Sequence, residues 1–463
     1  MKRLKQLTKL KLKLPKSTTI GIEHSDLVEF RDNKVFDNFL KIGIEKLSKI
    51  IKEAKFNSKF SEEELILRLN ENVNCFDTPH LLDTFITIYS NGPWELSLSG
   101  NIFYQAGGLG RYSFGYNPEF LINKMKKDFF SMDQTNLSLI KFDLLKELES
   151  KIGSTRVNSS YYKYSFFQTE LETFNYFFKL INENTNKNLK EKKFKSVKKI
   201  IFKKSLIQNR LLNFNDDDFI LIDCNNHDDL EKIFKHIKKK RIYIEACFID
   251  SLVGVNEFID PDFYLDLYDR LKENNSLIIV DSSNTSLRAN GNLSIIDNPG
   301  FAGLPMPDIE LFSNSLTSGS FPLLIAGLNE EIVNIIFQQT SLNNQYSLLV
   351  AKKVLSSFDQ EVKENIINTG SYLNDKFINL VEKFPEYIID VKLSGLFINC
   401  LFKSNINLEK FEGIIFTLNK SGLKVSKGNN NSIQITPWFY ADKKEIDLII
   451  KILEKVLYSE LFL

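Results

Sequence analysis

The strongest constraint on the fold is the alternation of short apolar runs with longer segments of helical periodicity. Apolar runs bounded by polar turns occupy residues 241–248 (RIYIEACF), 276–281 (SLIIVD) and 321–328 (FPLLIAGL). Between and before them, segments such as 36–55 and 261–274 place apolar residues three and four positions apart, which is typical of amphipathic helices. Strands that alternate with helices form a mostly parallel sheet covered on both faces. The sequence therefore predicts an α/β fold.

The length of the chain indicates more than one domain. A chain of 463 residues exceeds what a single hydrophobic core usually organises. Further apolar runs and an amphipathic helix near the carboxyl terminus predict a smaller α+β domain. We expect an N-terminal helical segment over 1–75 that joins the small domain, a large domain over 76–335, and an interface helix with the small domain over 336–463.

Composition excludes several classes of function. Sixty basic and 59 acidic side chains give a net charge of +1, so no global charge favours a nucleic-acid partner. The four cysteines and four histidines have no metal-site spacing, so we expect no metal and free thiols in the reducing cytoplasm. No run approaches the roughly 20 apolar residues of a membrane span.

The first sixteen residues differ from the rest of the chain. They contain seven basic residues, no acidic residue, and leucines between the lysines. Such a segment is either a membrane-surface or targeting element or a solvated leader, and the sequence leaves both open.

One apolar run delivers a carboxylate to the edge of the predicted sheet. Asp281 ends the run 276–281 and is followed by a polar loop that ends in glycine. Ligands bind outside the carboxyl ends of parallel strands. Asp281 therefore either caps a nearby loop or faces a cationic group of a ligand.

Asp281 and the later loop 311–319 (LFSNSLTSG) together resemble the class III (omega) aminotransferases, which are pyridoxal-phosphate enzymes of fold type I. Segments 110–125, 243–255 and 338–355 also resemble motifs of this family. The resemblance implies a mostly parallel seven-stranded sheet in the large domain, a smaller α+β domain, pyridoxal phosphate as the cofactor, and a homodimer or a heterodimer with a related chain.

The resemblance also identifies a missing catalytic group. In the family, a lysine holds the cofactor as a Schiff base and an aspartate pairs with its pyridinium nitrogen. Asp281 matches this aspartate, but Asn314 stands at the lysine position, and no lysine occurs between Lys272 and Lys352. Asparagine cannot form an imine, so Asn314 is not expected to be catalytically competent.

The positions implied to contact the cofactor phosphate are altered as well. They correspond to Thr169, Glu170 and Leu171, with Thr340 as the contact across the dimer and Asn284 as a further cofactor position. The family uses small residues there, so that backbone N–H groups at a helix N-terminus approach the phosphate. A glutamate at that place repels a dianion.

Two further positions depart from the family, and three functions remain open. Ser282 replaces a glutamate, and Gln434 replaces the arginine that binds a substrate carboxylate. The chain is then a non-catalytic binding or regulatory pseudoenzyme, a lysine-independent pyridoxal- or pyridoxamine-phosphate enzyme, or a low-activity transaminase that acts on an amine or amino acid. The altered phosphate positions favour the first, because a lysine-free enzyme depends more on phosphate contacts.

Overall fold

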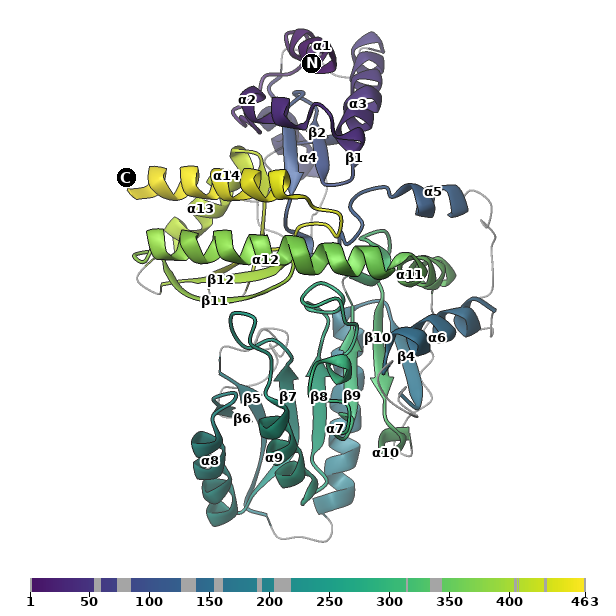
Figure 1. The fold of residues 1–463 in the computed structure, drawn as a ribbon, viewed down its shortest axis with the longest axis vertical. Helices are drawn as coiled ribbons and strands as arrows, with labels where there is room; N and C mark the ends of the chain where they lie inside the picture. Colours follow the sequence, from purple (N-terminus) through teal and green to yellow (C-terminus); the bar gives the residue numbers. More distant parts are fainter. Residues whose placement is uncertain are drawn as a thin grey trace. The chain divides into compact units, whose positions relative to one another are not determined.

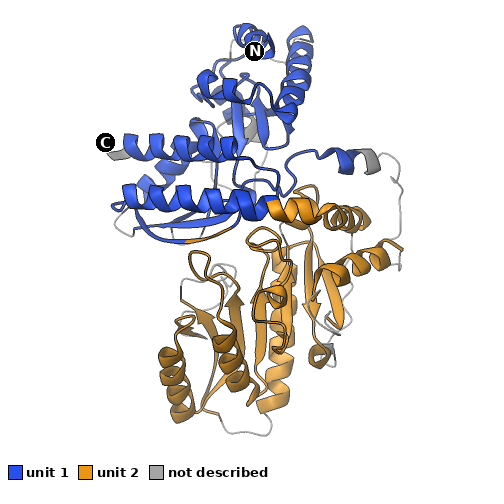
Figure 2. Ribbon diagram, in the orientation of Figure 1, with its two compact units in different colours: residues 1–128, 365–391, 395–463 blue, residues 129–364, 392–394 orange. Residues whose placement is uncertain are grey.

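The structure, a computed structural model, divides into two compact units. It describes residues 2–53, 60–72, 85–125, 139–153, 161–189, 194–203, 218–313, 315–333, 344–403, 406, 408–428 and 431–461. Unit 1 comprises residues 1–128, 365–391 and 395–463, and unit 2 comprises 129–364 and 392–394 (Figure 2). The division expected from the sequence, at residues 75 and 335, partitions the chain differently and stays a prediction about domains.

A seven-stranded sheet forms the centre of unit 2 (Figure 1). In the order in which they pair, its strands are β4 (Lys163–Phe167), β10 (Leu324–Leu328), β9 (Ile309–Phe312), β8 (Leu277–Asp281), β7 (Ile242–Asp250), β5 (Ser196–Phe202) and β6 (Phe219–Ile222). β10 is antiparallel to both of its neighbours, while the pairs from β9 to β6 are parallel. The predicted α/β fold with a mostly parallel seven-stranded sheet is confirmed.

Helices accompany these strands in unit 2. They are α6 (Leu139–Lys151), α7 (Glu170–Leu189), α8 (His227–Lys240), α9 (Pro261–Lys272), α10 (Glu330–Val333) and α11 (Gln345–Ser357). The start of α9 follows from its sequence, because Asp260 accepts hydrogen bonds from the first-turn amides and Pro261 has no amide to satisfy. Phe177 of α7 packs with Ile279 of β8 in one buried cluster, which explains why the central strands are apolar throughout.

Unit 1 contains two four-stranded sheets and several helices. One sheet is formed by β1 (Thr87–Asn91), β2 (Trp94–Ser97), β3 (Ile102–Gln105) and β13 (Leu423–Lys424). The other is formed by β11 (Ile388–Ser394), whose last three residues belong to unit 2, β12 (Phe397–Phe402), β15 (Ser432–Ile435) and β14 (Ser426–Lys427). Its helices are α1 (Lys2–Lys11), α2 (His24–Leu27), α3 (Lys34–Lys52), α4 (Glu62–Asn72), α5 (Glu119–Met125), α13 (Leu408–Lys420) and α14 (Lys443–Leu461), together with most of α12 (Gln360–Lys383). Because β13 pairs in parallel with β3, both halves of the chain contribute to one sheet.

One turn in unit 1 depends on its small and polar residues. Gly115 has φ +73°, and a Cβ atom there would lie 2.7 Å from the backbone of Gly92. Asn117 also has a positive φ, of 51°, and its side-chain amide donates to the carbonyl oxygen of Ser90 at 2.8 Å. The Gly-x-Asn-Pro sequence is therefore explained by the backbone conformation of the turn.

Candidate functional site

The carboxyl ends of β7 and β8 place two carboxylates side by side. Asp281 ends β8 and is in register with Asp250, which ends β7; on its other side it is in register with Leu311 of β9. Asp281 is buried, and its Oδ1 accepts hydrogen bonds from the amide of Ser283 at 2.9 Å and from the Ser283 hydroxyl at 2.5 Å. The carboxylate thus caps the loop that follows the strand.

Asp250 is a site residue that the sequence reasoning missed. Its Oδ2 lies 3.6 Å from Nζ of Lys392, and both side chains are buried. Glu245, which resembles a glutamate of the family motif, lies in the middle of β7 and forms an ion pair with Lys199 of β5. The carboxylate that β7 brings to the edge of the sheet is therefore Asp250 and not Glu245. The sequence contains a signal for this residue, because Asp250 follows directly on an apolar run.

A second missed residue, Glu310 of β9, organises the interior below this edge. Its fully buried carboxylate accepts hydrogen bonds from Ser282, Ser294, the Tyr161 hydroxyl (2.6 Å) and the amide of Ile295 (2.9 Å). Burial raises the pKa of Glu310, and the four hydrogen bonds oppose that rise. The Ser282 hydroxyl thus donates to a glutamate supplied by the neighbouring strand.

The loop after Asp281 is rich in hydroxyl groups and tightly packed. Asn284 is buried, and the Thr285 hydroxyl is 2.8 Å from that of Ser251. Arg288 is fully buried, and burial lowers its pKa to about 9. A polar cavity of about 10 Å³ lies beside these residues, about the space of one water molecule. The polar groups of this loop thus form hydrogen bonds with other groups of the same chain.

Asn314 lies outside the described residues, but its neighbours do not. The Ser315 hydroxyl donates to the carbonyl oxygen of Ser286 at 3.2 Å, and the amide of Ser282 donates to the carbonyl oxygen of Leu311 at 3.0 Å. Leu311 and Ser315 therefore both contact the loop that follows Asp281.

The residues at the start of α7 bond to one another. The Thr169 hydroxyl accepts from the amide of Glu172 at 3.1 Å, and the Glu172 carboxylate accepts from the amide of Gln168 at 3.0 Å. This arrangement is related to a capping box, except that the glutamate accepts from the residue before the N-cap. Glu170 adds a second carboxylate to the first turn, and Leu171 is exposed.

The remaining positions named from the sequence are placed elsewhere or not described. Thr340 lies outside the described residues, whereas Asn344 begins α11 and accepts from the amide of Tyr346 at 2.9 Å. Gln434 lies in β15 of unit 1, opposite Asn399 of β12. Its buried Oε1 accepts no hydrogen bond from any residue that the structure describes.

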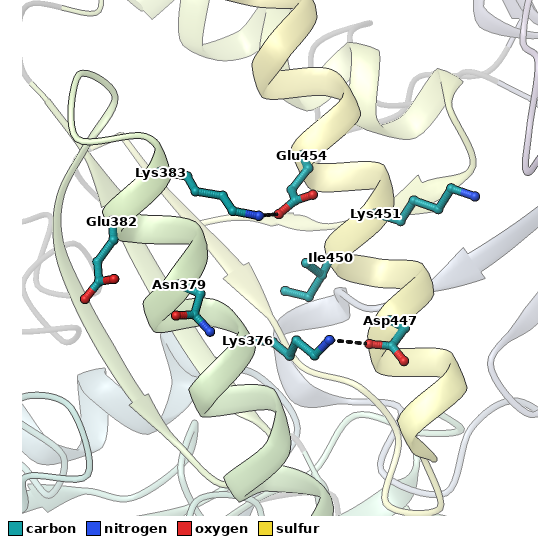
Figure 3. Close-up of a pocket in the computed structure, with 8 residues that line it drawn as sticks. All are labelled: Lys376, Asn379, Glu382, Lys383, Asp447, Ile450, Lys451 and Glu454. Carbon is teal, nitrogen blue, oxygen red and sulfur yellow. Dashed lines mark hydrogen bonds and ion pairs between the residues drawn. The ribbon is translucent and has the colours of Figure 1, made fainter.

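A groove in unit 1 does not coincide with these residues. It has a volume of about 560 Å³ and lies between α12 and α14, with none of the positions above in its lining (Figure 3). Its charges neutralise one another: Lys376 pairs with Asp447 at 3.0 Å, and Lys383 with Glu454 at 2.5 Å. The groove offers a ligand no unbalanced charge in these pairs, and the carboxyl edge of the sheet is the better candidate site.

The described residues contain neither a metal-binding cluster nor a membrane-spanning helix. Among the described residues, no three His, Cys, Asp or Glu side chains lie close enough to hold a metal ion. Within the same ranges, no helix is both long and apolar enough to cross a membrane. Burial raises the pKa of the Cys247 and Cys400 thiols, which lie in the interior.

Comparison with curated proteins gives relatives of one kind. The chain is 25% identical over 232 residues to ornithine aminotransferase 1 of Staphylococcus saprophyticus, a match that covers 50% of this chain and 56% of the relative. It is 26% identical over 227 residues to the mitochondrial alanine–glyoxylate aminotransferase 2 homolog 2 of Arabidopsis thaliana, with 46% of each chain covered. The chain thus spans about half the length of the curated relatives it matches.

Solved structures share the fold over a larger part of the chain. An ornithine δ-aminotransferase of Plasmodium falciparum aligns with a TM-score of 0.66 at 17% identity, and covers 86% of this chain and 98% of its own. An acetylornithine aminotransferase of Elizabethkingia anophelis aligns with a TM-score of 0.65 at 18% identity, and covers 86% and 99%. The sequence model of the aminotransferase class-III family matches residues 189–457. With more than half of its length matched, the chain belongs to the class III aminotransferase family.

Proposed function

We propose that this chain is a non-catalytic member of its family, a binding or regulatory protein that does not hold pyridoxal phosphate as a Schiff base. The sequence supports this proposal through Asn314, which stands at the position of the family lysine. An asparagine amide is neither a nucleophile toward an aldehyde nor a group that can carry a proton between substrate atoms.

The observation that carries the proposal is the side-chain cap and the acidic first turn of α7. An anion at a helix N-terminus binds the backbone N–H groups that have no partner within the helix. Here the Thr169 hydroxyl accepts from one of these groups, the amide of Glu172. The Glu172 carboxylate accepts from the amide of Gln168, just before the helix, and so places a negative charge at its start. Glu170 adds negative charge to the same turn. The residues at this position therefore do not fit a phosphate dianion.

Asp281, which matches the aspartate of the family, supports a second candidate function, that of a lysine-independent enzyme. Asp281 remains at the end of β8, where it could face a pyridinium nitrogen. Its hydrogen bonds to Ser283 give it a structural role without any ligand. We rank this candidate lower because a cofactor without a covalent link needs its phosphate contacts more.

We further propose that the protein works in the cytoplasm as a homodimer or as a heterodimer with a related chain. Unit 2 exposes several large apolar or aromatic side chains, among them Leu139 (82% exposed) and Phe142 (54%) on α6, Tyr162 (59%) before β4 and Leu171 (66%) on α7. Exposed apolar groups of this size favour a partner surface over water.

Equilibrium dialysis against pyridoxal phosphate and, separately, pyridoxamine phosphate tests the cofactor proposal. We expect no saturable binding of either compound, because the first turn of α7 repels their shared phosphate. An intact class III aminotransferase stripped of cofactor serves as the positive control. Saturable binding of pyridoxamine phosphate together with turnover of an amine substrate would contradict the proposal and show that the chain is a lysine-independent enzyme.

Sedimentation velocity tests the assembly. The double variant Leu139→Glu/Phe142→Glu should shift a dimer to monomer, since it places two charges among exposed apolar groups. A matched control, Leu67→Glu/Ile389→Glu, changes two exposed side chains of unit 1 and should leave the dimer intact. A wild-type chain that sediments only as monomer at micromolar concentration, alone and with related chains, contradicts the proposal.

A further inference from the structure

The amino-terminal segment carries a concentration of positive charge that the aminotransferase fold does not explain. Residues 1–53 contain thirteen Lys and Arg against seven Asp and Glu, a net charge of +6, although the whole chain carries +1. The remainder of the chain is therefore net negative. Charge asymmetry of this kind indicates a surface that meets a polyanion.

The structure shows which part of this segment is available. Leu4 and Leu7 of α1 are buried, and α1 packs against α3 (Figure 1). The leucines are thus used to hold α1 on the protein. α1 is therefore an ordered part of unit 1, and the leucine face is not free to enter a bilayer.

The opposite side of α1 presents the lysines. We call Lys2, Lys5, Lys9, Lys13 and Lys16, all exposed, the amino-terminal basic stripe. Lys2, Lys5 and Lys9 are three and four positions apart, so their side chains project from one face of the helix. Leu12, just beyond the end of α1, is 88% exposed and continues the same spacing from Lys9. The stripe therefore ends in one projecting apolar side chain.

We propose that the amino-terminal basic stripe docks this protein on an anionic phospholipid surface, with the lysines at the headgroups and Leu12 inserted among them. Lysines near an anionic membrane surface attract it at about 1 kcal/mol each, which is a factor of about five in affinity. An exposed leucine between lysines gains by entering the boundary between headgroups and acyl chains.

The composition of the segment favours lipid over nucleic acid. Residues 2–20 contain no aromatic side chain on which a base could stack. The single arginine of α1, Arg3, forms an ion pair with Asp37 of α3, so its guanidinium is engaged within the protein. An exposed leucine gives no advantage against a phosphodiester backbone. The proposal is independent of the cofactor question, because it concerns a different surface.

Flotation of the full chain with phosphatidylcholine vesicles, with and without phosphatidylserine, tests the proposal. We expect binding only to the vesicles that contain phosphatidylserine, and we expect added salt to weaken it. The variant Lys2→Ala/Lys5→Ala/Lys9→Ala should bind about 100-fold more weakly, from three factors of about five. The control Lys238→Ala/Lys239→Ala/Lys240→Ala removes the same charge from exposed lysines of α8 and should bind like wild type.

Leu12→Ser separates a lipid surface from other polyanions. It should weaken vesicle binding and leave binding to heparin unchanged, because only the vesicle accepts an apolar side chain. Equal binding to both kinds of vesicle, equal loss in the α8 control, or single-stranded DNA binding tighter than vesicle binding overturns the proposal. Circular dichroism of each variant establishes that α1 and the fold are retained.

Discussion

Two buried carboxylates at opposite ends of the β8–β9 strand pair are held in different ways. Asp308, just before β9, accepts from Nζ of Lys272 (2.7 Å), the amide of Ile278 (2.7 Å) and the side-chain amide of Asn329 (2.9 Å). Asp281, at the end of β8, accepts from Ser283, two residues along the chain. The first contact network joins three elements, while the second closes one loop.

The two carboxylates therefore have different roles: Asp308 stabilises the sheet, while Asp281 lies at the candidate site. Ligands of open α/β sheets bind at the carboxyl end of the strands, where Asp281 lies. The opposite end is remote from such a ligand, and there Asp308 joins α9, β8 and the residue that follows β10. We infer that this end of the sheet is stable without a ligand, because the contacts of Asp308 do not involve the carboxyl edge.

The largest expected effect comes from breaking the scaffold pair. Lys272→Met leaves the fully buried Asp308 without its cation and should lower the free energy of unfolding by about 3 kcal/mol or more. Urea denaturation measures this. Lys235→Met, which breaks an exposed pair with Glu231 on α8, should cost less than about 1 kcal/mol. An equal loss in the free energy of unfolding for the two variants would contradict the claim that the buried pair stabilises the fold more than the exposed pair.

A pH series extends the comparison to a buried carboxylate of unit 1. Burial and the nearby Asp442 raise the pKa of Glu445 to about 8, although Trp438 and Tyr104 donate hydrogen bonds to it. The folded chain therefore retains a proton that the unfolded chain releases near the usual pKa of about 4.3. The stability from this group is full below that value and is lost as pH rises toward about 8.

Glu445→Gln tests that direction. The unfolding free energy of wild type, relative to the variant, should fall as pH rises between about 5 and 8, by at most about 1.4 kcal/mol per unit. Urea titrations of both proteins at several pH values give the difference. A difference that grows with pH would mean that Glu445 is ionised in the folded chain and held by its donors.

A smaller effect is expected at the start of α7. Thr169→Ala removes the acceptor for the Glu172 amide and should cost about 1 kcal/mol. Thr169→Ser keeps the acceptor and should be nearly neutral. Thermal unfolding of the two variants measures the difference. Equal unfolding temperatures would mean that the Thr169 hydroxyl does not cap the helix, and would contradict the proposal that this cap excludes a phosphate.

The smallest effect is expected at the site carboxylate itself. Asp281→Asn keeps an oxygen that accepts from Ser283, so the free energy of unfolding should change by less than about 1 kcal/mol. A cost as large as that of Lys272→Met would place Asp281 in the scaffold. The comparison between the two ends of the sheet would then fail.

The sequence predicts the fold and one edge of the site well, since those depend on local patterns. The run SLIIVD predicts a buried strand that ends at Asp281, and the structure confirms β8 over Leu277–Asp281. The apolar spacing of residues 261–274 likewise predicts a helix, and the structure has α9 over Pro261–Lys272. Both signals are contained in short stretches of consecutive residues, where hydrophobic periodicity is sufficient.

Contacts between distant segments could not be predicted in the same way. Tyr161 and Glu310 are hydrogen-bonded although they are far apart in the chain, and Lys392 reaches Asp250 from a separate strand. A glutamate inside the run IELF is a visible anomaly, yet its donors follow only from the packing of three elements. Register between strands, which sets Asp250 beside Asp281, is likewise a property of the folded sheet.

The central claim, that the chain forms no Schiff base with pyridoxal phosphate, is tested most directly by borohydride reduction followed by peptide mass spectrometry. Wild type and Asn314→Lys are each incubated with pyridoxal phosphate, reduced and digested. The account predicts no pyridoxyl group on the 311–327 peptide of either protein, because Asn314 cannot form an imine and the capped, acidic start of α7 excludes the phosphate in the variant. A stoichiometric pyridoxyl adduct on that peptide of Asn314→Lys would contradict it and show that the pocket is still a cofactor site.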